Sequence, residues 1–185
     1  PLDRTALGGS LTGVFLGFSG TEFAQVLAAS PAGGSVYAAT GSSASIAAGR
    51  LSYTLGLHGP CVSYDTACSA ALAACHAGLR TLQLDECATG VTVAVSLILS
   101  PVVSISFAVA GMTSARGRSH TFDARADGYA RGEACCAVSL AVLAVSVDWM
   151  ATVGMAGCAV RQDGRSASLT APNGSSQPRL IEAVG

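Results

Sequence analysis

The chain has 185 residues, of which 50% are hydrophobic and only 11% are charged. This composition excludes a disordered chain, which needs many charges and few apolar side chains, and the length suits one domain with its own core. The net charge is −1, all ten cations are arginine, and no basic run could neutralise phosphates, so we expect no nucleic-acid partner.

The first half of the chain alternates between strand and helix patterns. An apolar run at 10–17 that ends in glycine predicts a buried strand, and short helices are expected at 21–29 and 42–51. A second strand is expected at 61–65. It leads into an alanine-rich helix at 69–84, which we expect to be buried nearly all round.

The stretch 91–110 holds no charged residue and is long and apolar enough to resemble a membrane span. Pro101 in its middle, and the β-branched alternation before it, favour a buried strand at 91–99, a turn, and a second packed segment at 104–112. A membrane-embedded protein is therefore the weakest of the alternatives, and we expect no membrane partner.

A polar, glycine-dotted loop is expected at 117–133, and we interpret its alternating charges as pairs that lock the loop and not as catalytic acids. Strands at 135–147 and 152–161 and a helix at 177–184 complete the chain. Strands that alternate with helices predict a layered α/β fold.

Seven cysteines are spread along the chain, at positions 61, 68, 75, 87, 135, 136 and 158. The odd number in a chain of this length argues against a disulfide framework, and no Cys or His spacing typical of zinc is present. We expect mostly buried, reduced thiols, no metal, and a reducing intracellular compartment such as the cytoplasm or a plastid.

Cys68 lies at the junction of a predicted strand and a predicted helix. At such a turn, unpaired backbone N–H groups and the positive end of the helix dipole face the sulfur. Both favour the thiolate, which is the nucleophilic form, and the same N–H groups can hold an oxyanion. Cysteine at such turns is more often structural. The position of Cys68 alone therefore leaves open whether it is a nucleophile or a structural residue.

Four ordered motifs resemble those of the β-ketoacyl synthases, and most closely the ketosynthase domains of modular polyketide synthases. The stretch 59–72, GPCVSYDTACSAAL, is similar to the active-site signature GPS-x-x-VDTACSSSL of that family. The other motifs are TG…AGRLSY at 40–53, FDARADGYARGE at 122–133 and QDGRS…LTAPNG at 162–174. On these residues the chain is identified as a member of the family.

The resemblance implies a thiolase-like layered α/β fold, in which a mixed sheet is packed by helices. The family's fold has two related βαβαβ halves, and residues 1–185 would be a partial ketosynthase domain, truncated at both ends and mainly its N-terminal half. It also implies a homodimer, in which the strand from Cys61 to Asp65 pairs with its two-fold mate.

The activity implied by the resemblance is an acyltransferase reaction of polyketide or fatty-acid synthesis, a decarboxylative Claisen condensation. Cys68 would accept an acyl group from a thioester, and a malonyl-type extender on acyl carrier protein would attack that acyl group. Both substrates are presented on the phosphopantetheine of the carrier protein, so no cofactor is expected on this chain.

The chain also departs from the family pattern. The family's two catalytic histidines and its lysine have no match, so Cys68 is the one key catalytic side chain that it holds. Ala134 and Cys136 replace two glycines of the family's RGEG-x-G stretch, and we expect strain there if these positions need a positive φ. These departures leave an alternative open, namely a non-catalytic, ketosynthase-like structural or interaction subunit.

Overall fold

The computed structural model of the protein describes residues 7–20, 22–142 and 153–184. Its strands are β1 (Thr12–Phe18), β2 (Cys61–Tyr64), β3 (Thr89–Ser96) and β4 (Ala134–Ala141). Its helices are α2 (Glu22–Ala28), α3 (Ala38–Ser42), α4 (Ala44–Leu55), α5 (Ala70–Gln83), α6 (Pro101–Val109) and α7 (Ser176–Glu182), with 3-10 turns at Pro31–Gly34 and Ala67–Ser69.

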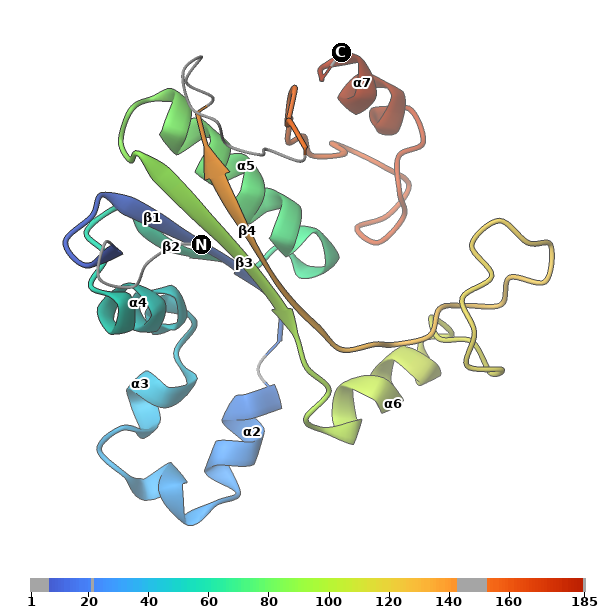
Figure 1. Cartoon of the computed structure of the whole chain (residues 1–185). Coiled ribbons are helices and arrows are strands. Elements are labelled where there is room, and N and C mark those ends of the chain that lie inside the picture. The colour runs from blue at the N-terminus through green and yellow to red at the C-terminus, as the bar shows by residue number, and fades with distance from the viewer. Residues whose placement is uncertain (1–6, 21, 143–152, 185) are drawn as a thin grey trace.

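The four strands form one mixed sheet in the order β2-β1-β3-β4. β1 is parallel to both β2 and β3, and β4 is antiparallel to β3. The connection from β1 to β2 passes through α4, the connection from β2 to β3 passes through α5, and the two helices cover opposite faces of the sheet (Figure 1). The layered α/β fold that the sequence predicts is therefore confirmed.

Alternate residues of β1 face the two covering helices. Val14 and Leu16 pack with Ala48 in the core on the α4 side. On the other face, a Cβ added to Gly78 of α5 would lie 3.1 Å from Cδ2 of Phe15. Because successive side chains of a strand point to opposite faces, β1 is the buried centre of the fold and fixes the position of both helices.

Two non-glycine residues with a positive φ lie at the two ends of α5. Ala67, with a φ of 52°, precedes the helix and Asp85, with a φ of 56°, follows it. After the last turn, the N–H of Glu86 donates to the carbonyl of Thr81 at 3.0 Å and the N–H of Asp85 donates to that of Leu82 at 3.2 Å. This pattern satisfies the last carbonyls of a helix, so backbone geometry defines both ends of α5.

The expectation that this helix is buried nearly all round is wrong. Its buried residues follow one stripe, at Ala70, Ala74, Gly78, Thr81 and Leu82, whereas Leu72 is 72% exposed. The stripe has the spacing of three and four residues that keeps one helix face toward a sheet. The other sides of α5 are exposed or only half-buried.

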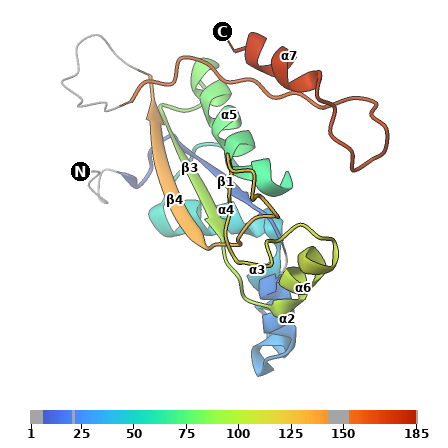
Figure 2. The same ribbon diagram turned by 90° about the vertical axis from the view of Figure 1, so that its right-hand side faces the viewer.

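Residues 97–133, which we call the arm, leave the sheet at the end of β3 and return to it at β4. The arm contains α6 and the polar loop, and it lies at the opposite end of the sheet from α7 (Figures 1 and 2). The apolar residues 91–110 are thus divided between β3 and α6, as expected. However, α6 begins at Pro101 itself and has no buried residue, so the packed segment expected at 104–112 is not found. None of the helices in the described ranges is both long enough and apolar enough to cross a bilayer.

Ala134 and Cys136, which replace the two family glycines, both lie in β4. They pair with Ser96 and Ala94 of β3, and neither has a positive φ. The expected strain is therefore absent at these two positions, because an extended backbone accepts any side chain that the neighbouring strand leaves room for.

The strand expected at 152–161 does not form within residues 153–161. Gly154 and Gly157 disfavour a strand there, and the carbonyl of Cys158 accepts a hydrogen bond from Arg80 of α5 at 3.5 Å instead of one from a sheet. The strand expected at 135–147 is β4 as far as Ala141. Residues 143–147 and 152, and residue 21 at the start of another expected element, lie outside the described residues.

Candidate active site

The turn that carries Cys68 follows the carboxyl end of β2, next to the carboxyl end of β1. The chain leaves β1 toward α4 on one face of the sheet and leaves β2 toward α5 on the other face. Open α/β sheets bind ligands at the carboxyl ends of their strands, and with the strand order 2-1-3 the crevice lies between β1 and β3. The fold therefore places Cys68 at this edge of the sheet, beside that crevice and not in it.

Hydrogen bonds close the turn around Cys68, which lies in the 3-10 turn Ala67–Ser69 and is exposed. The N–H of Ala67 donates to Oδ1 of Asp65 at 3.1 Å. The N–H and the hydroxyl of Ser69 donate to the carbonyl of Thr66 at 3.2 and 2.9 Å. The same hydroxyl lies 2.9 Å from Oγ1 of Thr66. The turn is thus held by its own side chains.

Ser69 is the N-cap residue of α5, but its side chain makes no cap hydrogen bond with the helix. Its hydroxyl is directed back to Thr66 instead. Ser69 therefore leaves the N–H groups of the first turn of α5 free of the hydrogen bond that a cap side chain usually makes. These groups are the donors that could hold an oxyanion formed beside Cys68.

Gly17 of β1 brings the sheet against the start of α5. A Cβ on Gly17 would lie only 2.5 Å from the carbonyl oxygen of Ala70 and 2.7 Å from the nitrogen of Ala71. Gly17 also pairs with Tyr64, the last residue of β2. The turn that carries Cys68 therefore rests directly on the central strand. Sequence reasoning placed Gly17 at the end of a strand but missed this contact, because the contact lies between residues far apart in the chain.

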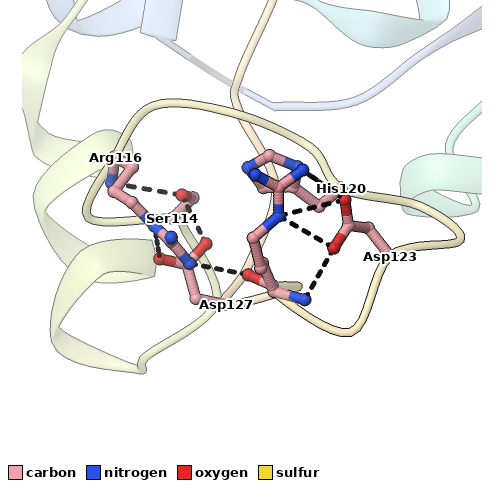
Figure 3. Close-up of polar contacts among 6 residues, drawn as sticks. Ser114, Arg116, His120, Asp123 and Asp127 are labelled. Atoms are coloured by element: carbon pink, nitrogen blue, oxygen red, sulfur yellow. Dashed lines mark hydrogen bonds and ion pairs between the residues drawn. The ribbon is translucent and has the colours of Figure 1, made fainter.

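The charged residues of the arm's loop pair with one another (Figure 3). Asp127 accepts from the hydroxyl of Ser114 at 2.6 Å and from Nε of Arg116 at 3.0 Å. Asp123 lies 2.6 Å from Nη2 of Arg125. Hydrogen bonds from Ser114 and Arg116 hold the pKa of Asp127 below its ordinary value, and Arg125 does the same for Asp123. The expected pairing within the loop is thus found for Asp123 and Asp127.

Glu22, the first residue of α2, joins that helix to the beginning and the end of the arm. Its Oε2 atom accepts from the N–H groups of Leu99 and Ser100 at 2.5 and 3.0 Å, and its Oε1 atom lies 3.3 Å from Nη2 of Arg131. Both partners of this ion pair are largely buried. Sequence reasoning paired Arg131 within its own loop and missed Glu22. The only signal for Glu22 was its place as an acid in the first turn of an expected helix.

Three further contacts fasten the returning end of the arm. Oε1 of Glu133 accepts from the N–H of Ile98 at 2.8 Å, and Arg131 donates to the hydroxyl of Ser104 at 2.5 Å. The guanidinium carbon of Arg131 lies 5.5 Å from the centroid of the Phe107 ring. The two chain segments that connect the arm to the sheet are thus bound to each other and to α2.

A cavity of about 210 Å³ lies at the carboxyl ends of β1 and β3, on the α4 side of the sheet. Its wall includes Phe18, Val95 and Arg50, but Cys68 is not among the lining residues. The candidate nucleophile is therefore exposed at the surface of this chain and does not lie in that cavity.

Comparison with known proteins adds to this geometry. The family model described as "Beta-ketoacyl synthase, N-terminal domain" matches residues 2–145. The chain is 43% identical over 179 residues to a phenolphthiocerol/phthiocerol polyketide synthase of Mycobacterium tuberculosis, covering 95% of this chain and 12% of that protein. It is 37% identical over 182 residues to "Erythronolide synthase EryA2" of Saccharopolyspora erythraea, covering 97% of this chain and 5% of that protein. The chain thus spans only a small part of the length of these relatives.

Solved ketosynthase structures have the same fold. The ketosynthase from module 6 of the bacillaene synthase of Bacillus subtilis 168 superposes with a TM-score of 0.80 at 32% identity, over 98% of this chain and 31% of that one. The mixed sheet and its covering helices thus define the thiolase-like class of α/β proteins. Within that class, the chain belongs to the β-ketoacyl synthase family and corresponds to part of a polyketide synthase ketosynthase domain.

Proposed function

We propose that the chain is part of an enzyme that performs the decarboxylative Claisen condensation of polyketide or fatty-acid synthesis, with Cys68 as its nucleophile. The observation that carries this proposal is the place of Cys68, which is exposed at the strand-to-helix turn before α5. It lies within the stretch that resembles the active-site signature of the family that the chain belongs to.

In the first half-reaction, the Cys68 thiolate attacks the carbonyl carbon of an acyl thioester on the phosphopantetheine of acyl carrier protein. A carbon–sulfur bond forms at Sγ, the bond to the pantetheine sulfur breaks, and that sulfur leaves and takes up a proton. In this proposal, N–H groups in the first turn of α5, which the side chain of Ser69 leaves uncapped, stabilise the negative oxygen of the intermediate.

In the second half-reaction, a malonyl-type extender on the carrier protein loses carbon dioxide. The electron pair left on its α-carbon attacks the acyl carbonyl on Cys68, and the thiolate is released as the new carbon–carbon bond forms. The phosphopantetheine belongs to the carrier protein, so the proposal places no cofactor on this chain.

Acyl loading tests the first half-reaction on the chain itself. The chain is incubated with an acyl thioester of N-acetylcysteamine, digested, and its peptides are weighed by mass spectrometry. We expect the acyl group on the Cys68 peptide in excess over the peptides of Cys61 and Cys135, which are also exposed. Cys68→Ala should abolish this adduct, and the matched control Cys61→Ala should retain it.

Equal acylation of the exposed cysteines, or no adduct on Cys68, would overturn the nucleophilic role. The alternative, a ketosynthase-like structural or interaction subunit, would then account better for the fold.

A further inference from the structure

The residue directly before the candidate nucleophile has a strained backbone. Ala67 has a φ of 52°, a region in which the Cβ of an L-residue crowds the neighbouring carbonyl oxygen. Such outliers persist only where the surrounding structure holds them, and they gather at functional sites. Neither Ala67 nor Cys68 is buried, so packing of their side chains in a core does not hold this conformation.

The turn contains two side chains that can hold it. Oδ1 of Asp65 accepts the N–H of Ala67 at 3.1 Å, and the hydroxyl of Ser69 donates to the carbonyl of Thr66 at 2.9 Å. Asp65 and Ser69 are both exposed. The first hydrogen bond lies before Cys68 in the sequence and the second spans it, so together they restrain the peptide units that set the direction of its Cα–Cβ bond.

We propose that Asp65 and Ser69 are positioning residues that hold Ala67 in the left-handed conformation and so direct Cys68 toward the start of α5. The inference rests on the proposed function, because it assigns these residues a role through the nucleophile. If φ of Ala67 relaxed to a negative value, the turn would rotate and the sulfur would leave the N–H groups of the first helical turn. The effect of those groups falls off within one turn.

The sign of the effect separates positioning from simple electrostatics. Asp65 places a negative charge near Cys68, and a nearby negative charge disfavours a thiolate. Loss of that charge alone should therefore speed the reaction of Cys68. Loss of the hydrogen bond to Ala67 should slow it. Asp65→Ala removes both, whereas Asp65→Asn removes the charge and keeps an oxygen that can accept the N–H.

The test is the rate of alkylation by iodoacetamide at neutral pH, measured per cysteine by peptide mass spectrometry on the full chain. We expect Asp65→Ala to slow Cys68 about tenfold, toward the rate of the exposed thiol of Cys61, which serves as an internal reference. Asp65→Asn should react at least as fast as the unaltered chain. Ser69→Ala should slow Cys68 less, and Ser69→Thr should restore its rate.

A double variant tests the strain itself. Glycine adopts a positive φ without steric cost, so Ala67→Gly should make the hydrogen bond from Asp65 less necessary. We expect Asp65→Ala combined with Ala67→Gly to recover Cys68 to within about threefold of the unaltered rate, which is a non-additive result typical of residues that share one interaction.

An unchanged Cys68 rate in Asp65→Ala, or an equal loss in Asp65→Asn, would overturn the positioning role. Faster labelling of the buried thiol of Cys87 would reveal that a variant had unfolded. In that case, the Asp65→Asn and Ala67→Gly variants decide whether Asp65 positions Cys68. If Cys68 of the unaltered chain reacts no faster than Cys61 and takes no acyl group, the proposed function itself is wrong. Failure of the proposed function can therefore be distinguished from failure of the positioning role.

Discussion

Oε1 of Glu22 lies 3.3 Å from Nη2 of Arg131, although the two residues are 109 positions apart in the chain. Glu22 begins α2, the first helix after the central strand β1, and Arg131 precedes β4, which lies at the edge of the sheet. Burial opposes the charge of Glu22, but the N–H groups of Leu99 and Ser100 and the guanidinium of Arg131 outweigh it and lower its pKa. The ion pair therefore fastens the arm to α2.

Loss of the cation should free the arm more than the rest of the fold. In Arg131→Met the carboxylate of Glu22 stays buried without its ion-pair partner, which is costly. We expect faster amide hydrogen exchange across residues 97–133 and little change in β1, measured by mass spectrometry. Arg118→Met is the control, since Arg118 makes no ion pair within the described residues. Equal exchange in the two variants would contradict the role of Glu22.

Acid should loosen the arm before it unfolds the sheet. The folded-state pKa values of Glu22 and Asp127 lie below their ordinary values of 4.5 and 3.8. Their contribution to stability is therefore complete above those ordinary values and is lost as the pH falls through the lower, folded-state values. Hydrogen exchange of the arm measured from pH 6 downward, and corrected for intrinsic rates, should rise first below about pH 4. Simultaneous exposure of β1 would count against this order.

Gly17→Ala should destabilise the fold at the turn that carries Cys68. The added methyl group would lie 2.5 Å from backbone atoms of α5, and overpacking of this kind lowers the free energy of unfolding by about 1–3 kcal/mol. Gly49→Ala is the matched control in α4, where no atom lies within 4 Å of the new Cβ. It should raise that free energy by roughly 0.5–1 kcal/mol, because alanine favours a helix. Urea denaturation of both variants measures the difference.

The seven thiols should differ widely in alkylation rate. Burial raises the pKa of Cys87 and that of Cys75, so fewer of these thiols are in the reactive thiolate form at neutral pH. We expect Cys87, which is 5% exposed, to react last, and the exposed thiols of Cys135 and Cys136 to react well before it. A time course of iodoacetamide labelling that found Cys87 among the first would show that the core opens readily.

The homodimer implied by the family resemblance predicts which edge of the sheet pairs with a second copy. β2 lies at one edge and β4 at the other, and an edge strand can pair with another chain. We expect Cys61→Lys on β2 to weaken the dimer, because a lysine on an edge strand opposes pairing of that edge with another chain. Val138→Lys on β4 should leave it intact. Light scattering at several concentrations compares the two, and dissociation by the β4 variant alone would contradict this pairing.

Elements with local signals could be predicted from the sequence. The strand patterns located β1, β2 and β3 to within a few residues, and the helix after Cys68 was placed almost correctly. The helix expected to end at residue 51 continues to Leu55, where Gly56 adopts a φ of 67° and stops it. The stretch before Gly56 is poor in strong helix formers, so its local preference alone does not extend the helix.

Features that depend on distant residues could not be predicted. The bond of Glu22 to Arg131 and the contact of Gly17 with α5 exist only after the sheet has formed. The prediction of mostly buried thiols is wrong for Cys61, Cys68, Cys135 and Cys136, which are exposed. Hydrophobic composition does not say which face of a strand or helix is covered. The left-handed Ala67 also gives no signal, because alanine is an unfavourable residue for that conformation.

The fixed ends of α5 restrict insertions and deletions in the part of the gene that encodes this helix. Each residue of a helix adds about 100° of rotation and 1.5 Å of length, and Ala67 and Asp85 leave no frayed turn to absorb either. One inserted or deleted codon within the 14 residues of α5 would pull Gly78 away from Phe15 or rotate the Cys68 turn off Gly17. Length changes in homologous genes should therefore fall in the arm's loop and spare this helix.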